Sequence, residues 1–430
     1  MRLLLLTFLF APSFALGQAS SDNLSRLPDG EEKRRFIIDC TGCHQFDSVV
    51  VGRRSREQWA NDVSRMLNFG GAHTGFPVIS AYRNAERTAE WLHASLAAVP
   101  APRPAAVPVR EGRAEITEFP MSDPGDLLHD VAVDSGGRVI VTGMFSHRMY
   151  VLDPASGRLD TLALPRTPAQ PRAVELDASG NWYVLLGAQP RAIARRDARS
   201  GAWTTTDIGM YPHSIGIDAQ GRAWFNGHFT VAPEQIGVVE SNGQVRTFEV
   251  PPHPVMNAAG NGPIPYELRL GPDGRVWMSE LQGNRIIGFD PRSGRFEAFM
   301  MPTTFSGPRR FDLDSAGILW IPAYGANMLV RLDPATGRFT EYALPVRDAA
   351  PYVARVDRSG AVWIGTGAAD VVLRFDPRTS QFTRYPLPSR GAMVRHMAID
   401  PRSGDVWLAY GASPGRISAR IARLRVSGER

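Results

Sequence analysis

The stretch Pro272-Asp-Gly-Arg-Val-Trp277 is a tight turn that leads into a strand, and the chain contains seven such segments. Each copy ends on one bulky residue, and these residues are Ile140, Tyr183, Trp224, Trp277, Trp320, Trp363 and Trp407. Successive copies are about 41–44 residues apart, with one longer interval between Trp224 and Trp277. Repeats of this length, made of short strands and turns, are typical of propeller blades. The sequence therefore predicts an all-β, seven-bladed β-propeller over residues 113–428.

The two ends of the repeat region also predict how the ring closes. The segment Ile116–Pro120 reads as an outer strand without a blade of its own, and Ile417–Val426 ends a blade that has no outer strand. We expect these two segments to pair, which would remove the exposed sheet edge. The longer interval contains the segment 251–262, which we interpret as a loop insertion that overhangs one face.

A second motif, Cys40-Thr-Gly-Cys-His44, holds both cysteines of the chain. The spacing C-x-x-C-H is the pattern of covalent haem attachment, in which two thiols form thioethers and the histidine binds the iron. A thioredoxin-like redox pair would need a βαβ context, and a zinc site would need further ligands. A disulfide across two residues would close a strained loop. The motif predicts one covalent haem c, held by Cys40 and Cys43, with His44 as the proximal iron ligand.

Residues 29–99 around this motif read as helical. Ser55 and Gln58 form a capping box, and Trp59, Val63 and Met66 follow at helical spacing, with Gly70-Gly71 as the expected end. A second helix is expected at 84–97, followed by a Pro/Ala-rich linker over 100–112. Some seventy residues make a small core, and a porphyrin would enlarge it.

The sixth iron ligand is left open among several residues. Met66 is the first candidate, because it lies on the helix after the attachment motif at the phase of Trp59 and Val63. A methionine in an apolar face also serves as simple core packing. His73 is the runner-up and His93 is a weaker candidate, and an open site at the iron is a further alternative.

Residues 1–19 predict a cleaved signal peptide, because a positive start and an apolar run precede a segment of small residues. Haem c is attached outside the cytoplasm in bacteria, so a periplasmic location is expected. No later segment is long and apolar enough to predict a membrane span. The net charge is only +5, and the arginines are scattered, so nucleic acid binding is not expected.

One residue per blade, five positions before the turn, forms a column that should line one mouth of the central channel. The column residues are His129, Arg172, His213, Tyr266, Arg309, Tyr352 and Arg395. Such a mouth is cationic and rich in hydrogen-bond donors, which suits a small anionic ligand. The alternative is that these side chains satisfy one another around an inert channel. His228, Glu280, Tyr324 and Tyr410 are expected nearby.

The repeat, best seen in Gln282–Gly294 and in Asp333-Pro-Ala-Thr-Gly337, resembles the streptogramin (virginiamycin B) lyase-like family over about residues 113–426. The resemblance implies a propeller that opens a cyclic depsipeptide by elimination with magnesium. His213 and Glu280 match two of the family's catalytic positions, whereas Tyr266 replaces the second histidine. The N-terminal region is similar to small class I-like cytochrome c domains through Cys40–His44 and the helix that carries Arg54, Trp59, Val63 and Met66.

Together these features predict a small all-α cytochrome c-like domain followed by an all-β seven-bladed propeller. The first interpretation is a periplasmic monohaem cytochrome that transfers electrons with a redox partner protein, the propeller serving as a docking or substrate-binding module. A haem-dependent oxidoreductase subunit is one form of this interpretation. The alternatives are a magnesium-dependent streptogramin B-type lyase, with His213, Tyr266 and Glu280 as catalytic candidates, and a non-catalytic protein-binding propeller.

Overall fold

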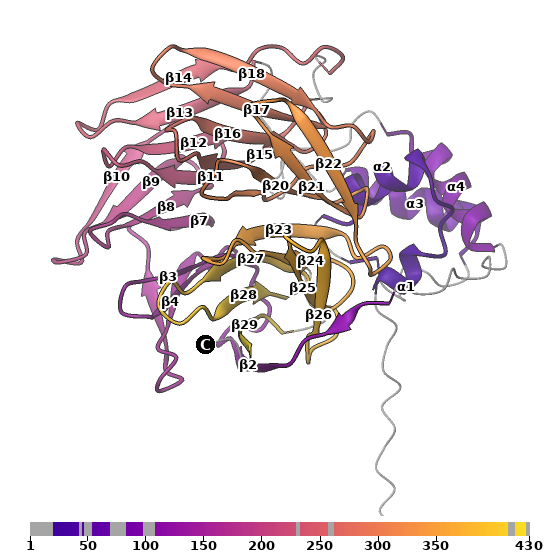
Figure 1. The fold of residues 1–430 in the computed structure, drawn as a ribbon, viewed down its shortest axis with the longest axis horizontal. Coiled ribbons are helices and arrows are strands. Elements are labelled where there is room, and N and C mark those ends of the chain that lie inside the picture. The colour runs from indigo at the N-terminus through magenta and orange to yellow at the C-terminus, as the bar shows by residue number, and fades with distance from the viewer. Residues whose placement is uncertain are drawn as a thin grey trace, which may run out of the picture.

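The structure, a computed structural model, describes residues 20–42, 45–46, 54–68, 83–97, 108–228, 233–256, 262–411 and 418–426. The predicted signal peptide (1–19), Cys43, His44, His73 and Gly70-Gly71 lie outside these residues. Within the described residues, the chain forms four helices and then 29 strands. Figure 1 shows the strands as a ring of sheets and the helices gathered at one side of it.

Seven sheets form the ring, which confirms the seven-bladed propeller. The first three blades are β3 (Leu128–Val133), β4 (Val139–Gly143), β5 (Arg148–Leu152), β6 (Leu159–Ala163); β7 (Pro171–Leu176), β8 (Trp182–Leu186), β9 (Ala192–Arg196), β10 (Trp203–Asp207); and β11 (Pro212–Ile217), β12 (Ala223–Gly227), β13 (Gln235–Val239), β14 (Val245–Glu249). The next three are β15 (Pro265–Leu270), β16 (Val276–Glu280), β17 (Arg285–Asp290), β18 (Arg295–Met300); β19 (Asp312–Leu313), β20 (Leu319–Ala323), β21 (Met328–Asp333), β22 (Arg338–Ala343); and β23 (Pro351–Val356), β24 (Val362–Thr366), β25 (Val371–Asp376), β26 (Gln381–Pro386).

The seventh blade closes the ring with strands from both ends of the repeat region. It contains β27 (Val394–Ile399), β28 (Val406–Tyr410), β29 (Arg420–Val426) and β2 (Ala114–Pro120). Strands β2 and β29 pair antiparallel along their whole length, from Ala114 opposite Val426 to Pro120 opposite Arg420. The predicted pairing of these segments is confirmed. Ahead of it, β1 (Arg110–Glu111) adds in parallel to the outer strand β26 of the sixth blade.

In several blades a turn aspartate fixes the local shape. In the sixth blade, Asp357 Oδ1 accepts the backbone N–H groups of Ser359 and Ala361 at 2.8 and 3.1 Å. Its Oδ2 accepts the indole N–H of Trp363 at 2.9 Å. Gly360 completes the turn at φ 82°, a conformation that favours glycine. One carboxylate thus fixes both the turn and the buried tryptophan of the next strand, and the indoles of Trp224 and Trp320 donate to Asp218 and Asp314 in the same way.

The helices are α1 (Ser20–Leu24), α2 (Glu31–Cys40), α3 (Arg56–Leu67) and α4 (Ala85–Ala97). The capping box at the start of α3 is confirmed, because Ser55 accepts from Gln58 N and Gln58 accepts from Ser55 N. Helix α3 ends earlier than expected, at Leu67, since the Asn68 side chain binds the Ser64 carbonyl oxygen at 2.9 Å.

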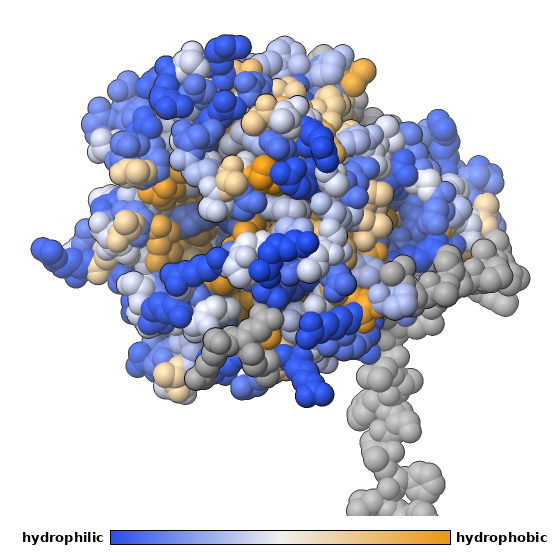
Figure 2. Space-filling model, in the orientation of Figure 1, coloured by the Kyte–Doolittle hydropathy of each residue, from blue (hydrophilic) through white to orange (hydrophobic). Residues whose placement is uncertain are grey.

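The helices do not keep a core of their own. One buried cluster joins Phe36, Phe46, Trp59 and Leu92 of the helical region to propeller residues such as Tyr352. The face of the molecule in Figure 2 is mainly hydrophilic, with apolar residues in small groups. None of the helices that the structure describes is long and apolar enough to cross a membrane.

Candidate functional site

Six of the seven column residues lie at an irregularity of the innermost strand. In β3, β7, β11, β15, β23 and β27 the pairing with the next strand shifts register at or beside the column residue, as between Pro351 and Val353 around Tyr352. In the fifth blade, Arg309 precedes β19, beside an isolated bridge from Pro308 to Ala323. A bulge re-aims a side chain, and bulges are frequent beside functional sites.

The column side chains are buried and several of them meet. The rings of His129 and His213 are 5.2 Å apart, and those of His213 and Tyr266 are 4.2 Å apart. The hydroxyl of Tyr266 lies 2.5 Å from that of Tyr352 and accepts a bond of 2.9 Å from Arg309 Nη1. Arg172 donates to the hydroxyl of Tyr211. Five of the seven positions are thus brought together by direct contacts, and Arg395 joins them through Tyr352 at 3.4 Å.

Burial and the neighbouring arginines set the protonation of this cluster. Burial lowers the pKa of His129 to about 3, and burial with nearby positive groups holds the pKa of His213 and His228 well below the usual value. Burial also raises the pKa of Tyr266. For Tyr352, burial is outweighed by the positive charges of Arg309 and Arg395, which lower its pKa. The histidines are therefore neutral, and Tyr352 is the hydroxyl most ready to ionise.

The other residues expected near the mouth have different surroundings. His228 does lie there, with its ring 4.4 Å from that of His213. Glu280 is fully buried and forms a two-point ion pair with Arg285, whose Nη2 lies 2.9 Å from Oε1. Burial raises the pKa of Glu280. Tyr410 donates to Glu118 in the ring-closing blade. Glu280 and Tyr410 therefore each serve a local polar contact.

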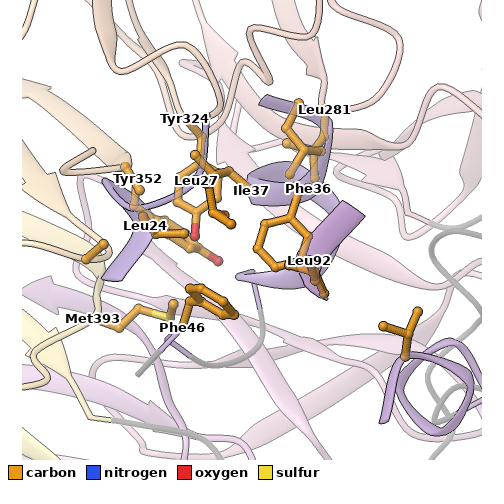
Figure 3. Close-up of a cluster of buried hydrophobic side chains, with 14 of the residues drawn as sticks. Leu24, Leu27, Phe36, Ile37, Phe46, Leu92, Leu281, Tyr324, Tyr352 and Met393 are labelled. Carbon is orange, nitrogen blue, oxygen red and sulfur yellow. The ribbon is translucent and has the colours of Figure 1, made fainter. Parts of the chain in front are cut away.

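The helical region covers the same mouth. The Tyr324 hydroxyl donates to the Thr41 carbonyl oxygen at 2.9 Å and lies 2.8 Å from the Thr41 hydroxyl. Arg395 Nη1 donates to the Gly42 carbonyl oxygen at 2.9 Å. Figure 3 shows Leu24, Phe36, Ile37 and Phe46 of this region converging with propeller residues, among them Tyr324 and Tyr352. The first residues of the attachment motif thus lie directly on the column.

Polar contacts around this point hold the two parts of the chain together. Lys33 forms a buried ion pair with Asp348 at 2.8 Å. The backbone of Ser21 donates to the Ala368 carbonyl at 2.8 Å, and Gln45 donates to the Gly367 carbonyl at the same distance. Buried pairs of this kind require a fixed geometry. The helical region is therefore docked on the propeller in a defined position.

Cys40 lies at the edge of the apolar cluster that joins the helices to the propeller. Cys40 is the last residue of α2 and is partly buried against the aromatic and apolar cluster of Phe36, Phe46 and Leu92. A porphyrin ring needs such an apolar environment, and two thioethers need a short turn after the helix. Cys43 and His44 lie outside the described residues, so their part in this site stays a prediction. Among the described residues, no group of three or more His, Cys, Asp or Glu side chains is arranged to hold a metal ion.

The candidates for the sixth ligand occupy different environments. Trp59 and Val63 are buried on α3 as expected. Met66 follows them at helical spacing in the last turn of this helix, and its side chain is 39% exposed. His93 Nδ1 lies 3.2 Å from the Arg54 carbonyl oxygen. The ligand itself stays a prediction.

A second layer of charges in the channel was missed by the sequence analysis. Arg310 lies 2.7 Å from Asp130 and 3.5 Å from Glu267. Arg355 binds Glu267 at 3.2 Å and His396 at 2.6 Å. Four of these five residues come directly after a column residue in the sequence: Asp130, Glu267, Arg310 and His396. A search for charged residues at this repeated position could have found them. The network joins blades one, four, five, six and seven across the channel.

Residues 253–429 match the profile of the Virginiamycin B lyase family. Over this segment the propeller is similar to the Virginiamycin B lyase family. Among solved structures, virginiamycin B lyase from Staphylococcus aureus aligns with a TM-score of 0.63 at 20% identity, over 73% of this chain and 100% of that one. A streptogramin B lyase structure aligns with a TM-score of 0.64 at 21% identity, over 73% and 98% of the two chains.

The same fold also occurs in proteins that are not lyases. Hydrazine synthase from Kuenenia stuttgartiensis aligns with a TM-score of 0.58 at 14% identity, over 73% of this chain and 99% of that one. A search of curated proteins found no significant match. At these identities the likeness shows the fold and leaves the activity to be argued from the site.

Proposed function

We propose that the protein is an exported monohaem c-type cytochrome whose attachment motif lies on the mouth of a virginiamycin B lyase-like propeller, and that it transfers electrons to or from a periplasmic redox partner. The supporting observation is that Thr41 and Gly42, between the two motif cysteines, bind Tyr324 and Arg395 of the mouth. A haem bound at Cys40 and Cys43, with His44 on the iron, would supply one-electron oxidation and reduction.

The residues of this chain would hold the group, exclude water and fix its orientation. The apolar cluster around Phe36, Phe46 and Leu92 offers the dry environment, and the docked interface fixes the turn after α2. In this proposal the propeller is a rigid platform for the attachment segment. The cationic column lies buried beneath the attachment segment.

The test is the spectrum of the full chain exported from a host that attaches haem c. Covalent haem is expected after denaturation, with a reduced-minus-oxidised spectrum of a c-type cytochrome, and the double variant Cys40→Ser, Cys43→Ser should carry none. The weak methionine–iron band tests Met66, and its loss in Met66→Ala would support that ligand. Purified protein without covalent haem would refute the proposal.

The lyase alternative rests on the family match and on the contact between His213 and Tyr266. Two observations favour electron transfer over it. Glu280 is held by Arg285, and residues Thr41 and Gly42 lie over the column. A protein-binding role without catalysis would be supported by copurification of a dehydrogenase subunit with haem-free variants.

A further inference from the structure

The attachment turn is held by two side chains of the propeller. Tyr324 donates to the carbonyl oxygen of Thr41, and Arg395 donates to the carbonyl oxygen of Gly42, both at 2.9 Å. Gly42 is followed directly by Cys43 and then by His44. Consecutive Cα atoms are about 3.8 Å apart, so the propeller contacts lie within about 8 Å along the chain from the predicted iron ligand.

A second guanidinium lies against the same turn. Arg309 is 2% exposed, and its guanidinium carbon is 3.9 Å from the centre of the Tyr324 ring and 4.3 Å from that of Tyr352. A β-carbon at Gly42 would lie 2.6 Å from Arg309 Nη2, so the glycine is what admits this close approach. The aromatic rings hold the guanidinium in place through cation–π contacts.

The charges near Cys40 differ on its two sides. On the helical side, the carboxylate of Asp39 lies 2.9 Å from Arg83, and the two opposite charges compensate each other. On the propeller side, Arg309 and Arg395 bind hydroxyl and carbonyl oxygens of Tyr266, Tyr352 and Gly42. An arginine keeps its proton in a protein. Charges in a buried site act over a longer range than charges in water.

We propose that Arg309 and Arg395 of the propeller tune the haem, and that their positive charges raise its reduction potential while Tyr324 and Arg395 position the attachment turn. This inference rests on the proposed function. A positive charge beside the iron favours the reduced state, which carries one positive charge less. The propeller would then be part of the redox centre, and the potential would report on whether the two parts are docked.

The experiment measures the midpoint potential of the full-length holoprotein by spectroscopic titration. A unit charge about 10 Å away at an effective dielectric constant of about 20 predicts a change of about tenfold in the reduction equilibrium. Arg309→Gln and Arg395→Gln should therefore each lower the potential by about 59 mV. Arg395→Lys keeps the charge and should restore most of the potential. Covalent haem content is measured on every sample.

Two matched variants separate charge from packing. Arg172→Gln removes a buried arginine of the same column whose partner is Tyr211, and it should shift the potential less. Tyr324→Phe removes a contact to the turn without removing charge. It should change the reduction equilibrium constant by less than about twofold. Equal shifts for Arg172→Gln and Arg395→Gln, or a full shift for Tyr324→Phe, would overturn the inference. Absence of covalent haem in the unmodified protein would instead refute the proposed function.

Discussion

The hydroxyl oxygens of Tyr266 and Tyr352 lie 2.5 Å apart, although the two residues belong to the fourth and sixth blades. The fifth blade places Arg309 between them, within bonding distance of Tyr266 and over the face of Tyr352. The mouth of the channel is therefore bridged by its own side chains.

The ionisation of Tyr352 is the first testable consequence of this contact. Its pKa is lowered by Arg309 and Arg395 despite burial, so one tyrosine should ionise at a lower pH than the ordinary value of about 10. The pKa of this acidic hydroxyl is lower in the folded than in the unfolded chain. Its ionisation therefore adds to the stability of the fold as pH rises through the folded-state pKa, and this contribution is lost as pH falls. The phenolate absorption is the measurement. Tyr352→Phe should abolish the early step, whereas Tyr150→Phe, whose pKa burial raises, should retain it. An early step that persists in Tyr352→Phe would contradict the assignment.

The buried charges below the mouth should contribute strongly to stability. Arg310→Met leaves Asp130 and Glu267 buried without their shared partner, and such a change typically costs about 3–5 kcal/mol. The free energy of unfolding in urea measures this loss. Arg378→Met removes an exposed arginine paired with Asp376 and should leave stability unchanged. Equal stability of the two variants would show that the ion pairs of Arg310 with Asp130 and Glu267 do not stabilise the ring.

The bond between indole and turn aspartate can be tested by comparing two blades. Trp363 donates to Asp357, whereas the indole nitrogen of Trp407 has no hydrogen-bond partner among the described residues. Both side chains are buried. Trp363→Phe should therefore cost about 1–2 kcal/mol more in unfolding free energy than Trp407→Phe. Similar losses would mean that packing alone explains the repeated tryptophan.

Ring closure provides a further prediction. Glu118 on β2 accepts from the Tyr410 hydroxyl and from the backbone and hydroxyl of Ser389 at 3.1 and 2.9 Å. Glu118→Ala leaves these donors without an acceptor and should cost about 1–3 kcal/mol of unfolding free energy. Glu115→Ala, on the same strand but 61% exposed at its side chain, is the control and should be nearly neutral. The measurement is thermal unfolding of both variants at one pH.

Incubation with a streptogramin B-type depsipeptide and magnesium tests the lyase alternative. No linearised product is expected, because Tyr266 stands where the family has a second histidine and Thr41 and Gly42 cover the column. Mass spectrometry would detect the product. If the depsipeptide is linearised and this activity disappears in His213→Ala, the protein is a lyase, and electron transfer is no longer the preferred function.

The propeller could be predicted from sequence because its repeat is imposed by local chemistry. The turn aspartate, the glycine at positive φ and the tryptophan are coupled by short-range hydrogen bonds, as Asp357, Gly360 and Trp363 show. The pairing of β2 with β29 followed from counting strands. Such features need no knowledge of distant contacts.

The docking of the helical region could not be predicted from sequence. It depends on contacts between residues far apart along the chain, such as Thr41 with Tyr324 and Lys33 with Asp348. Nothing in the local pattern marks either partner. The charged network behind the column was missed for a related reason, because Arg310 and Asp130 pair across the ring and their blades do not adjoin.

The closing of the ring by its last strand also sets an order of events during biogenesis. Cys40 leaves the ribosome long before β27 and β29, and the platform formed by Arg309 and Arg395 cannot exist until those strands have arrived. Cys40 therefore stays uncovered by the completed propeller for as long as the rest of the chain is being made. Completion of the seventh blade would end that interval, so any attachment chemistry at Cys40 is timed by the opposite end of the polypeptide.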